Sequence, residues 1–293
     1  MAGSVSVLSL AEATLHAVVI PLFGADGLST ELEAYLRDLV AAGLLVVLVD
    51  NNPEGALRPG RVPAGCHWVA NHNRGGIAGG LNRGVAWARA AGAHVLTLLD
   101  QDSRIAADQM AQLREPLERQ PQRRLVVGPG IWDAQRRQRH GRWRSSADGL
   151  DATRLLISSG TTFRSDDWPE LGTMHEDLWI DFVDHAWCFR AQARGFCLAQ
   201  HPAVLLYQQF GSVHPHPLCR WLGMRLYSPE RHYFALRNLR WLCRQPSVPL
   251  DLKIKEVLKM LLKPWLWLLF EPSRRANLKA VVRGLQAPLP GPY

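Results

Sequence analysis

Two apolar runs that each stop at an aspartate constrain the fold of this chain most. Residues 44–49 lead into Asp50-Asn51-Asn52-Pro53, and residues 94–99 lead into Asp100-Gln101-Asp102-Ser103. Short runs that are apolar throughout, without alternation, are typical of strands buried on both faces of a sheet. Residues 17–20, just before Pro21, predict a third strand of this kind.

Helical patterns fill the spaces between these strands. Thr30 and Glu33 have the spacing of a capping box and predict a helix start. Apolar residues behind it recur at helical spacing: Leu32, Tyr35, Leu36 and Leu39. Residues 77–91 predict a second helix. Alternating strands and helices predict an α/β fold with a mostly parallel central sheet flanked by helices. Ligands of such sheets bind outside the carboxyl ends of the strands, so Asp50 and Asp100 are expected at one binding edge.

The positive charge of the chain is concentrated near its C-terminus. The formal net charge is +8, yet residues 1–100 carry 6 arginines and 8 acidic residues, whereas residues 220–283 carry 14 Lys and Arg against 4 acidic residues. A cationic segment of this kind needs an anionic partner, and phospholipid, polyphosphate and nucleic acid all fit.

Signals for export or membrane insertion are missing from the sequence. The N-terminus, Met1-Ala2-Gly3-Ser4, has no basic region, so we expect no signal peptide. No apolar run reaches about 18 residues without a charge, so we expect no membrane span. The 5 cysteines include no Cys-x-x-Cys pair, which favours a reduced, cytoplasmic protein over a disulfide scaffold or a zinc finger.

The Asp-x-Asp after residues 94–99 is a candidate metal site. Where the chain turns out of the sheet, Asp100 and Asp102 can face one site and hold Mg²⁺ or Mn²⁺, with substrate phosphates completing the octahedron. The ion would offset charge on a phosphate or diphosphate leaving group. The same motif is also common as a turn or helix cap. Asp50, at the same edge, could accept a hydrogen bond from a base or a sugar hydroxyl.

Two further segments carry candidate groups. Residues 73–84 are rich in glycine at a helix start, so their backbone N–H groups could meet a phosphate or a polar ligand, although close helix–sheet packing explains the same pattern. They match neither the Walker A nor the Gly-x-Gly-x-x-Gly spacing. Asp181 and Asp184 lie three apart among Trp and Phe residues, which could raise a carboxyl pKa and create a general base. An exposed helical face is the alternative.

Taken in order, these segments resemble a known family. Asp50-Asn51-Asn52, Asn73-x-Gly75-x-x-Ala78-x-x-x-Asn82-x-Gly84 and Asp100-Gln101-Asp102-Ser103 are similar to the motifs of the inverting family 2 glycosyltransferases, which have the GT-A fold. Residues 176–190 (Glu-Asp-Leu-Trp-Ile-Asp-Phe-Val-Asp-x-x-Trp-Cys-x-Arg) and 228–238 (Ser-Pro-Glu-Arg-His-Tyr-Phe-x-x-Arg-Asn) resemble the bacterial rhamnosyltransferase branch. The resemblance covers roughly residues 16–245.

The resemblance implies a role for each candidate residue. Asp50 would bind the pyrimidine base of the donor, near the loop that starts at Pro21. The nucleotide-sugar pocket as a whole would be formed by Pro21, Asp50, Asn52, Asn73, Gly75, Asn82, Asp100 and Gln101. Asp102, with Asp100, would bind the divalent metal on the diphosphate. Asp184, with Asp181 as the second candidate, would be the base that deprotonates an acceptor hydroxyl, and a single displacement would invert the anomeric centre.

The resemblance also implies substrates and a place in the cell. The donor would be a dTDP- or UDP-linked sugar, with dTDP-L-rhamnose favoured, and the product a cell-surface polysaccharide such as lipopolysaccharide. The acceptor would be a glycan linked to polyprenyl diphosphate. The basic, Trp-rich C-terminal segment could hold the enzyme on the cytoplasmic face of the inner membrane without spanning it. An ordinary helical subdomain is the alternative for that segment, and no nucleic-acid partner is expected.

The expected organisation is a GT-A domain followed by a helical appendage. The GT-A domain would cover residues 1–215, with a nucleotide-sugar half at about 16–104 and an acceptor half at about 125–215. Within the acceptor half, residues 155–160 predict one more strand. Residues 216–293 would form a basic, Trp-rich helical region.

Three other interpretations stay open. Four apolar residues before Asp-x-Asp also open the haloacid-dehalogenase-like phosphatases, but those need a lysine before a second acidic pair, and the first lysine here is Lys253. A basic membrane- or nucleic-acid-binding protein without catalysis would fit the C-terminal charge, although no nucleic-acid module is visible. A degenerate glycosyltransferase fold would fit two departures from the branch: Ala186 replaces a usual acid, and Gln208 a usual histidine.

Overall fold

The computed structural model of the chain describes residues 14–24, 28–53, 62–133, 138–140, 149–208, 212–221 and 224–292. The N-terminal residues on which the prediction of no signal peptide depends lie outside this part of the chain. The side chain of Gln208, one of the two departures from the rhamnosyltransferase branch, lies outside it as well.

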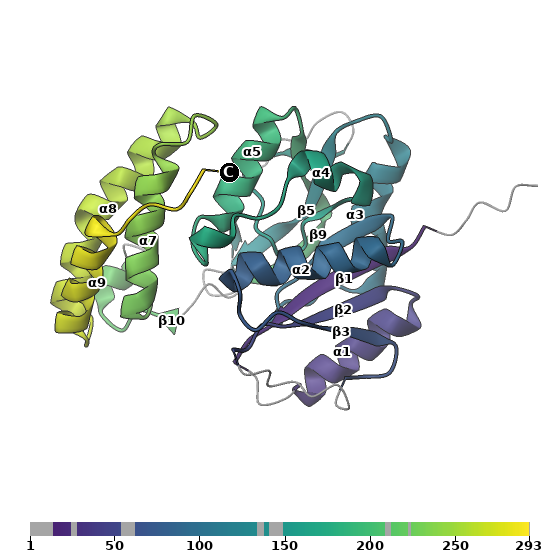
Figure 1. The fold of residues 1–293 in the computed structure, drawn as a ribbon, viewed down its shortest axis with the longest axis horizontal. Helices are drawn as coiled ribbons and strands as arrows, with labels where there is room; N and C mark the ends of the chain where they lie inside the picture. Colours follow the sequence, from purple (N-terminus) through teal and green to yellow (C-terminus); the bar gives the residue numbers. More distant parts are fainter. Residues whose placement is uncertain are drawn as a thin grey trace, which may run out of the picture.

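Nine strands of the described residues form one central sheet (Figure 1). Their order is β3-β2-β1-β4-β8-β5-β9-β7, and β6 pairs with β5. The strands are β1 (His16–Leu22), β2 (Leu45–Asp50), β3 (Cys66–Ala70), β4 (Val95–Leu98), β5 (Leu125–Asp133), β6 (Gln138–His140), β7 (Asp151–Ala152), β8 (Thr162–Arg164) and β9 (Cys197–Gln208). β1 to β4 are parallel, as are β5 and β9, whereas β8 runs antiparallel between β4 and β5. The predicted mostly parallel sheet is therefore confirmed.

Helices cover both faces of this sheet. They are α1 (Thr30–Ala41), α2 (Gly76–Ala90), α3 (Ala107–Arg119), α4 (Trp168–Leu171) and α5 (Val183–Ala193). α1 and α3 pack on one face, and α2, α4 and α5 pack on the other. In β1, Val18 and Ile20 belong to the first core, and Ala17 and Val19 to the second. This two-sided burial explains why the strand sequences are apolar throughout.

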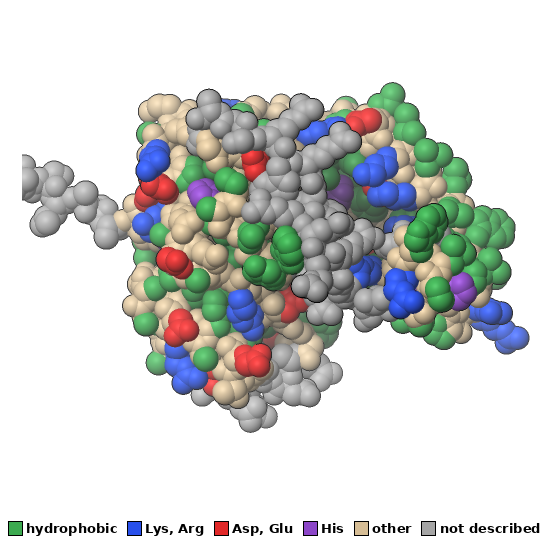
Figure 2. All heavy atoms as spheres, turned by 180° about the vertical axis from the view of Figure 1, so that it is seen from behind, with side chains coloured by type: hydrophobic (Ala, Val, Ile, Leu, Met, Phe, Trp, Pro, Cys, Tyr) green, Lys and Arg blue, Asp and Glu red, His purple; other side chains and the backbone are tan. Residues whose placement is uncertain are grey.

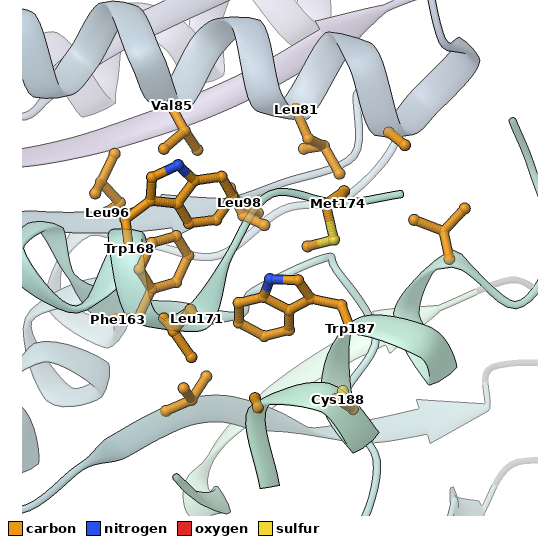
Figure 3. Close-up of a cluster of buried hydrophobic side chains, with 14 of the residues drawn as sticks. Leu81, Val85, Leu96, Leu98, Phe163, Trp168, Leu171, Met174, Trp187 and Cys188 are labelled. Carbon is orange, nitrogen blue, oxygen red and sulfur yellow. The ribbon is translucent and has the colours of Figure 1, made fainter. Parts of the chain in front are cut away.

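Aromatic side chains fill the core beneath α2 (Figure 3). The rings of Phe163 and Trp168 stack with their centroids 5.3 Å apart. Trp187 of α5 lies beside them, and its indole N–H donates to the carbonyl of Gly172 at 2.8 Å. A buried tryptophan needs such a partner for its N–H. The bond therefore fixes α5, whose first turn carries Asp184.

Two strand predictions need correction. β1 continues through Pro21 because its pairing with β4 ends at Val19, so no strand on that side needs a hydrogen bond from the proline. The strand predicted at residues 155–160 is wrong, since these residues form a loop and the strand is β8. The run ends in Ser158, Ser159 and Gly160, and Gly160 turns the chain at a φ of 85°.

Where the structure describes it, the chain after residue 216 is mostly helical and builds a core of its own. It also contains the short strand β11 (Arg225–Leu226), which pairs with β10 (Ser212–Val213). Its helices are α6 (Pro217–Trp221), α7 (Pro229–Leu242), α8 (Leu250–Phe270) and α9 (Arg274–Gln286). α7, α8 and α9 pack together beside the sheet, around a core that includes Leu236, Leu266 and Trp267 (Figure 1). Among the helices that the structure describes, none combines the length and apolar character needed to cross a bilayer.

Candidate active site

A cavity of about 460 Å³ lies beyond the carboxyl ends of β1, β2 and β4. One wall comes from the loops that follow these strands, and the other from the residues that lead into α5, closed by a side chain of α7. The lining residues are Phe23, Asn51, Asn73, Gly76, Ile77, Asp100, Ser158, Trp179, Ile180, Asp181, Phe182, Val183, Asp184, His185 and Arg231. Of the site residues predicted from sequence, Asn73, Asp100, Asp181 and Asp184 belong to this lining.

Asp50 and Asn52, which were predicted to bind the nucleotide, form hydrogen bonds with each other at the end of β2. Asp50 is buried, and its carboxylate accepts hydrogen bonds from the backbone N–H and the side-chain amide of Asn52, at 3.1 and 2.8 Å. The amide oxygen of Asn52 accepts in turn from the N–H of Gly24 at 2.7 Å. Neither side chain lines the cavity. Both hold the loop after β1 against the end of β2.

Gln101 holds the same loop from the β4 side. Its amide oxygen accepts from the N–H of Phe23 at 2.7 Å, and its amide nitrogen donates to the carbonyl of Phe23 at 3.1 Å. This reciprocal pair places the Phe23 ring, which is 54% exposed, at the cavity. Pro21 is buried in β1, where a Cβ added to Gly80 would lie 3.3 Å from it. Pro21 and Gln101 therefore position the cavity wall without lining it.

Asp100 is the carboxylate at the end of β4 that faces the cavity. Its backbone N–H donates to the hydroxyl of Ser159 at 3.2 Å. Burial raises the pKa of Asp100 to about 7, and the charges of Asp184 and Asp102 act in the same direction. Asp102 itself is exposed and does not line the cavity. A positive ion beside Asp100 would favour its ionised form.

Asp184 faces the same cavity from the first turn of α5. Burial raises the pKa of Asp184 to about 6, opposed by hydrogen bonds with the side chain and backbone of Ser158 and assisted by the charge of Asp181. A carboxyl group with this pKa is ionised at pH 7 and still basic enough to take a proton. Asp184 therefore has the properties expected of a general base.

Asp181 lines the cavity in an ion pair with α7. The guanidinium of Arg231 donates from Nη2 to Oδ1 at 3.0 Å, and from Nε to both carboxylate oxygens at 3.2 Å. Oxygen lone pairs that accept from a guanidinium are not available to a reacting proton. Of the two carboxylates predicted as catalytic, Asp184 therefore fits a general base better than Asp181, which the ion pair holds.

The backbone that leads into α5 has an unusual conformation. Trp179, Asp181 and Phe182 have φ angles of 65°, 59° and 63°. Positive φ is uncommon for residues other than glycine, and it persists where surrounding contacts impose it. These residues follow η3 (Glu176–Leu178), and only Val183 separates Phe182 from Asp184. The strain therefore lies close to the candidate base.

The contacts that hold this backbone come from α7. The Asn238 side chain is fully buried, and its amide nitrogen donates to the carbonyls of Leu178, Ile180 and Asp181 at 2.8, 2.7 and 3.0 Å. Arg237 donates to the carbonyls of Asp177 and Leu178. Four carbonyls within residues 177–181 are therefore tied to one helix of the C-terminal region.

The glycine-rich start of α2 packs against the same segment. Gly75 and Gly76 have φ angles of 66° and 59°. A Cβ on Gly76 would lie 2.5 Å from the carbonyl oxygen of Trp179, and one on Gly75 would lie 2.7 Å from Cβ of Glu176. The N–H of Ile77 donates to the same Trp179 carbonyl at 3.1 Å. Close approach and positive φ both require glycine here.

Asn82 strengthens this contact from the middle of α2. Its amide oxygen accepts from the N–H of Met174 at 2.8 Å, and its amide nitrogen donates to the carbonyl of Met174 and to Glu176, at 2.9 and 2.8 Å. We call this contact between α2 and residues 174–179 the α2 seam. Gly75 and Asn82 were predicted from sequence to bind the nucleotide sugar. They belong to the seam and do not line the cavity.

The carboxylates suit a divalent cation that binds together with a substrate. In the part of the chain that the structure describes, no group of three or more His, Cys, Asp or Glu side chains is assembled as a metal site. Mg²⁺ and similar ions often use one or two carboxylates, with phosphate and water oxygens as the remaining ligands. Asp100, crowded by two other negative charges, fits such an ion, with Asp102 nearby.

Several residues that build the site had no role in the sequence predictions. Asn51 lines the cavity and donates to the carbonyl of Gly76 at 2.9 Å. Ser158 bonds with Asp184. Arg231 and Asn238 stand in the motif at 228–238, which was the available signal, but their partners lie 50 or more residues earlier in the chain. Ala186, the departure from the usual acid, is buried in the core and does not line the cavity.

Comparison with known proteins supports this architecture. No protein-family model matches the chain. The dTDP-rhamnosyl transferase RfbF of Shigella flexneri is 27% identical over 239 residues, 77% of this chain and 79% of that protein. GalNAc-T7, solved with UDP, GalNAc and Mn²⁺, superposes with a TM-score of 0.52 at 13% identity, over 91% of this chain and 58% of that one.

This chain is a glycosyltransferase of the GT-A fold. A second solved structure agrees on the fold: residues 1–349 of S. aureus TarS with UDP-GlcNAc, at a TM-score of 0.51 and 12% identity, over 93% of this chain and 81% of that one. By its distant homology to RfbF, this glycosyltransferase is rhamnosyltransferase-like. The fold and the enzyme class predicted from the sequence are therefore confirmed.

Proposed function

We propose that this glycosyltransferase moves L-rhamnose from dTDP-L-rhamnose to a hydroxyl of a glycan, with inversion at the anomeric carbon. The observation that carries the proposal is that Asp100 and Asp184 face one cavity at the carboxyl edge of the sheet. Homology to a dTDP-rhamnosyl transferase supports the choice of donor. A glycan on polyprenyl diphosphate, for cell-surface polysaccharide synthesis, is the acceptor proposed with it.

The base in this mechanism is Asp184. Its carboxylate takes the proton of the acceptor hydroxyl, the hydroxyl oxygen forms a bond to the anomeric carbon, and the bond from that carbon to the nucleoside diphosphate breaks on the opposite side. One displacement of this kind inverts the configuration. Hydrogen bonds with Ser158 lower the pKa of Asp184, and the negative charge of Asp181 raises it. Trp179 and Phe182 limit access of water to the reacting atoms from that wall.

The donor diphosphate is proposed to lie beside Asp100. Asp100 and Asp102 would hold Mg²⁺ or Mn²⁺, which when bound offsets the negative charge that develops on the diphosphate. Phe23 and Asn51, at the ends of β1 and β2, line the side of the cavity where the nucleotide would lie. Asp50, Asn52 and Gln101 act on the nucleotide through the loop that they hold.

Calorimetric titration of the full chain with dTDP, UDP and GDP, each with and without Mn²⁺, tests donor and metal together. We expect dTDP to bind at least about tenfold more tightly with Mn²⁺. Asp100→Asn should remove that Mn²⁺ effect, and Asp108→Asn, an exposed acid on α3, should retain it. If none of the nucleotides binds, or chelation changes nothing for the wild type, the corresponding part of the proposal is wrong.

A turnover assay tests the reaction class. We expect dTDP release from dTDP-L-rhamnose to depend on an added glycan, and the anomeric proton of the product to show the inverted configuration by NMR. A product with retained configuration would contradict the single displacement. Turnover by the wild type would also exclude a degenerate fold without catalysis.

A further inference from the structure

The outer face of α8 carries a row of exposed apolar side chains. Seven of them are between 51% and 70% exposed: Leu250, Ile254, Leu258, Leu261, Leu262, Trp265 and Leu269. Their three- and four-residue spacing places them on one side of the helix along its whole length. Single exposed leucines are ordinary, but a continuous row this long marks an interaction surface. We call this row the α8 stripe; Figure 2 shows green side chains gathered at the outer edge of the C-terminal helices.

The segment that contains α8 and α9 has an excess of positive charge. Residues 250–286 contain 8 Lys and Arg against 3 acidic residues. Two of these acids, Glu256 and Glu271, are buried, and Asp251 is bound by Arg154 at 2.6 Å. Each residue turns the helix by about 100°, so Lys253 and Lys255 fall at the two edges of the stripe. Lys255 is exposed, whereas Lys253 is half-buried and its ammonium donates to the carbonyl of Gln245 at 2.7 Å. The surface is therefore an apolar centre with cationic borders.

We propose that α8 lies in the headgroup region of an anionic lipid bilayer with the α8 stripe inserted. A helix with an apolar face and a lysine-rich border lies in the interface instead of crossing it, and no described helix could span a membrane. The charge favours lipid over a second copy of this chain, since pairing two stripes would bring two cationic borders together. Each basic group near an anionic surface contributes about 1 kcal/mol to binding.

The opposite side of α8 lines a cavity next to the catalytic one. Glu256, Met260, Lys263 and Trp267 of α8 line a smaller cavity of about 180 Å³. That cavity and the catalytic one share Asp181, Phe182, His185 and Arg231. α8 and this smaller cavity therefore lie between the proposed lipid surface and the wall of the site. If the proposed transfer is correct, an acceptor anchored in the bilayer reaches Asp184 from this side.

Flotation of the full chain with lipid vesicles tests the inference. We expect binding to vesicles that contain phosphatidylglycerol, weaker binding to phosphatidylcholine alone, and a decrease with added salt. Trp265→Ser together with Leu261→Ser should lower the partition coefficient at least about tenfold. Tyr207→Ser, which removes a side chain of equal exposure (65%) from β9, should leave it unchanged. Thermal unfolding of each variant reports whether it is folded.

Several outcomes would overturn the inference. Absence of the wild type from floated vesicles would do so, as would equal partition of the wild type and the double variant. A concentration-dependent dimer in analytical ultracentrifugation, lost in the double variant and unaffected by lipid, would show that a second copy covers the stripe. Calorimetric binding of dTDP by the double variant should equal that of the wild type, so failure of this inference is distinguishable from failure of the proposed transfer.

Discussion

The two walls of the cavity are built in different ways. The strand-end wall follows β1, β2 and β4, and its polar side chains, such as Asn52 and Gln101, bind loops that are neighbours across the sheet. The other wall, residues 176–184, has positive φ angles and depends on Asn238 and Arg237 of α7. Parallel pairing positions the first wall, and side chains 50 to 60 residues away position the second.

Asp184→Asn tests the second wall most directly. We expect kcat to fall at least about 100-fold, the scale of a lost general base, with dTDP binding nearly unchanged. Steady-state kinetics and calorimetry on the same protein measure the two effects. The exposed-acid control Asp108→Asn should have wild-type kcat. Unchanged turnover in Asp184→Asn would remove this residue from the mechanism and return attention to Asp181.

Asn238→Ala tests whether α7 holds the strained segment. Loss of a buried amide that binds three carbonyls should cost about 2–3 kcal/mol of unfolding free energy and lower kcat about tenfold. Denaturant unfolding and kinetics measure these effects. The control is Gln245→Ala, just after α7, where the amide nitrogen donates to one carbonyl of α7, that of Trp241, at 3.2 Å. If Asn238→Ala does not fold, the milder Arg237→Gln replaces it; wild-type kcat in a folded variant would show that the segment holds its shape without α7.

Ionisation of Asp184 should set the acid limb of the pH–rate profile, and the Asp181–Arg231 ion pair beside it should determine the pH at which the limb falls. Activity needs ionised Asp184, so kcat/KM should fall as the pH drops through about 6. Asp181→Asn removes a negative charge that raises the pKa of Asp184, so the limb should move to lower pH. Arg231→Gln leaves Asp181 unpaired, so the limb should move to higher pH, each by about one unit or less. A change in activity that is equal at every pH would indicate damage to packing instead.

Gln101→Ala tests the strand-end wall and should have the smallest effect. Losing the reciprocal pair with Phe23 should raise the Kd of dTDP about 3- to 10-fold, because the loop must be ordered on binding, and leave kcat unchanged. Calorimetry and kinetics separate the two quantities. A fall in kcat with an unchanged Kd would show that the two walls are not independent.

The two walls also differ in how far sequence could predict them. Asp50 and Asp100 were placed at one edge because buried strands and helical spacing are local signals. Local signals could not show that the Asn82 amide binds Met174, nor that Asp181 is neutralised by Arg231. Residues 155–160 predict a strand but form a loop, because a short apolar run has the same composition in a buried strand and in a buried loop. The motif at 228–238 was visible, but its role depended on contacts with Leu178 and Asp181 that only the folded chain brings together.

The α2 seam has a consequence for turnover. Hydrogen bonds from Asn82 and Ile77, and the close packing of Gly76 on Trp179, join the two sides of the cavity. They cannot swing apart as hinged lobes without breaking these bonds. We therefore expect the nucleoside diphosphate to leave past a short segment that can move by itself. Phe23, which the side chain of Gln101 holds at the cavity, is where we expect the rate of product escape to be decided.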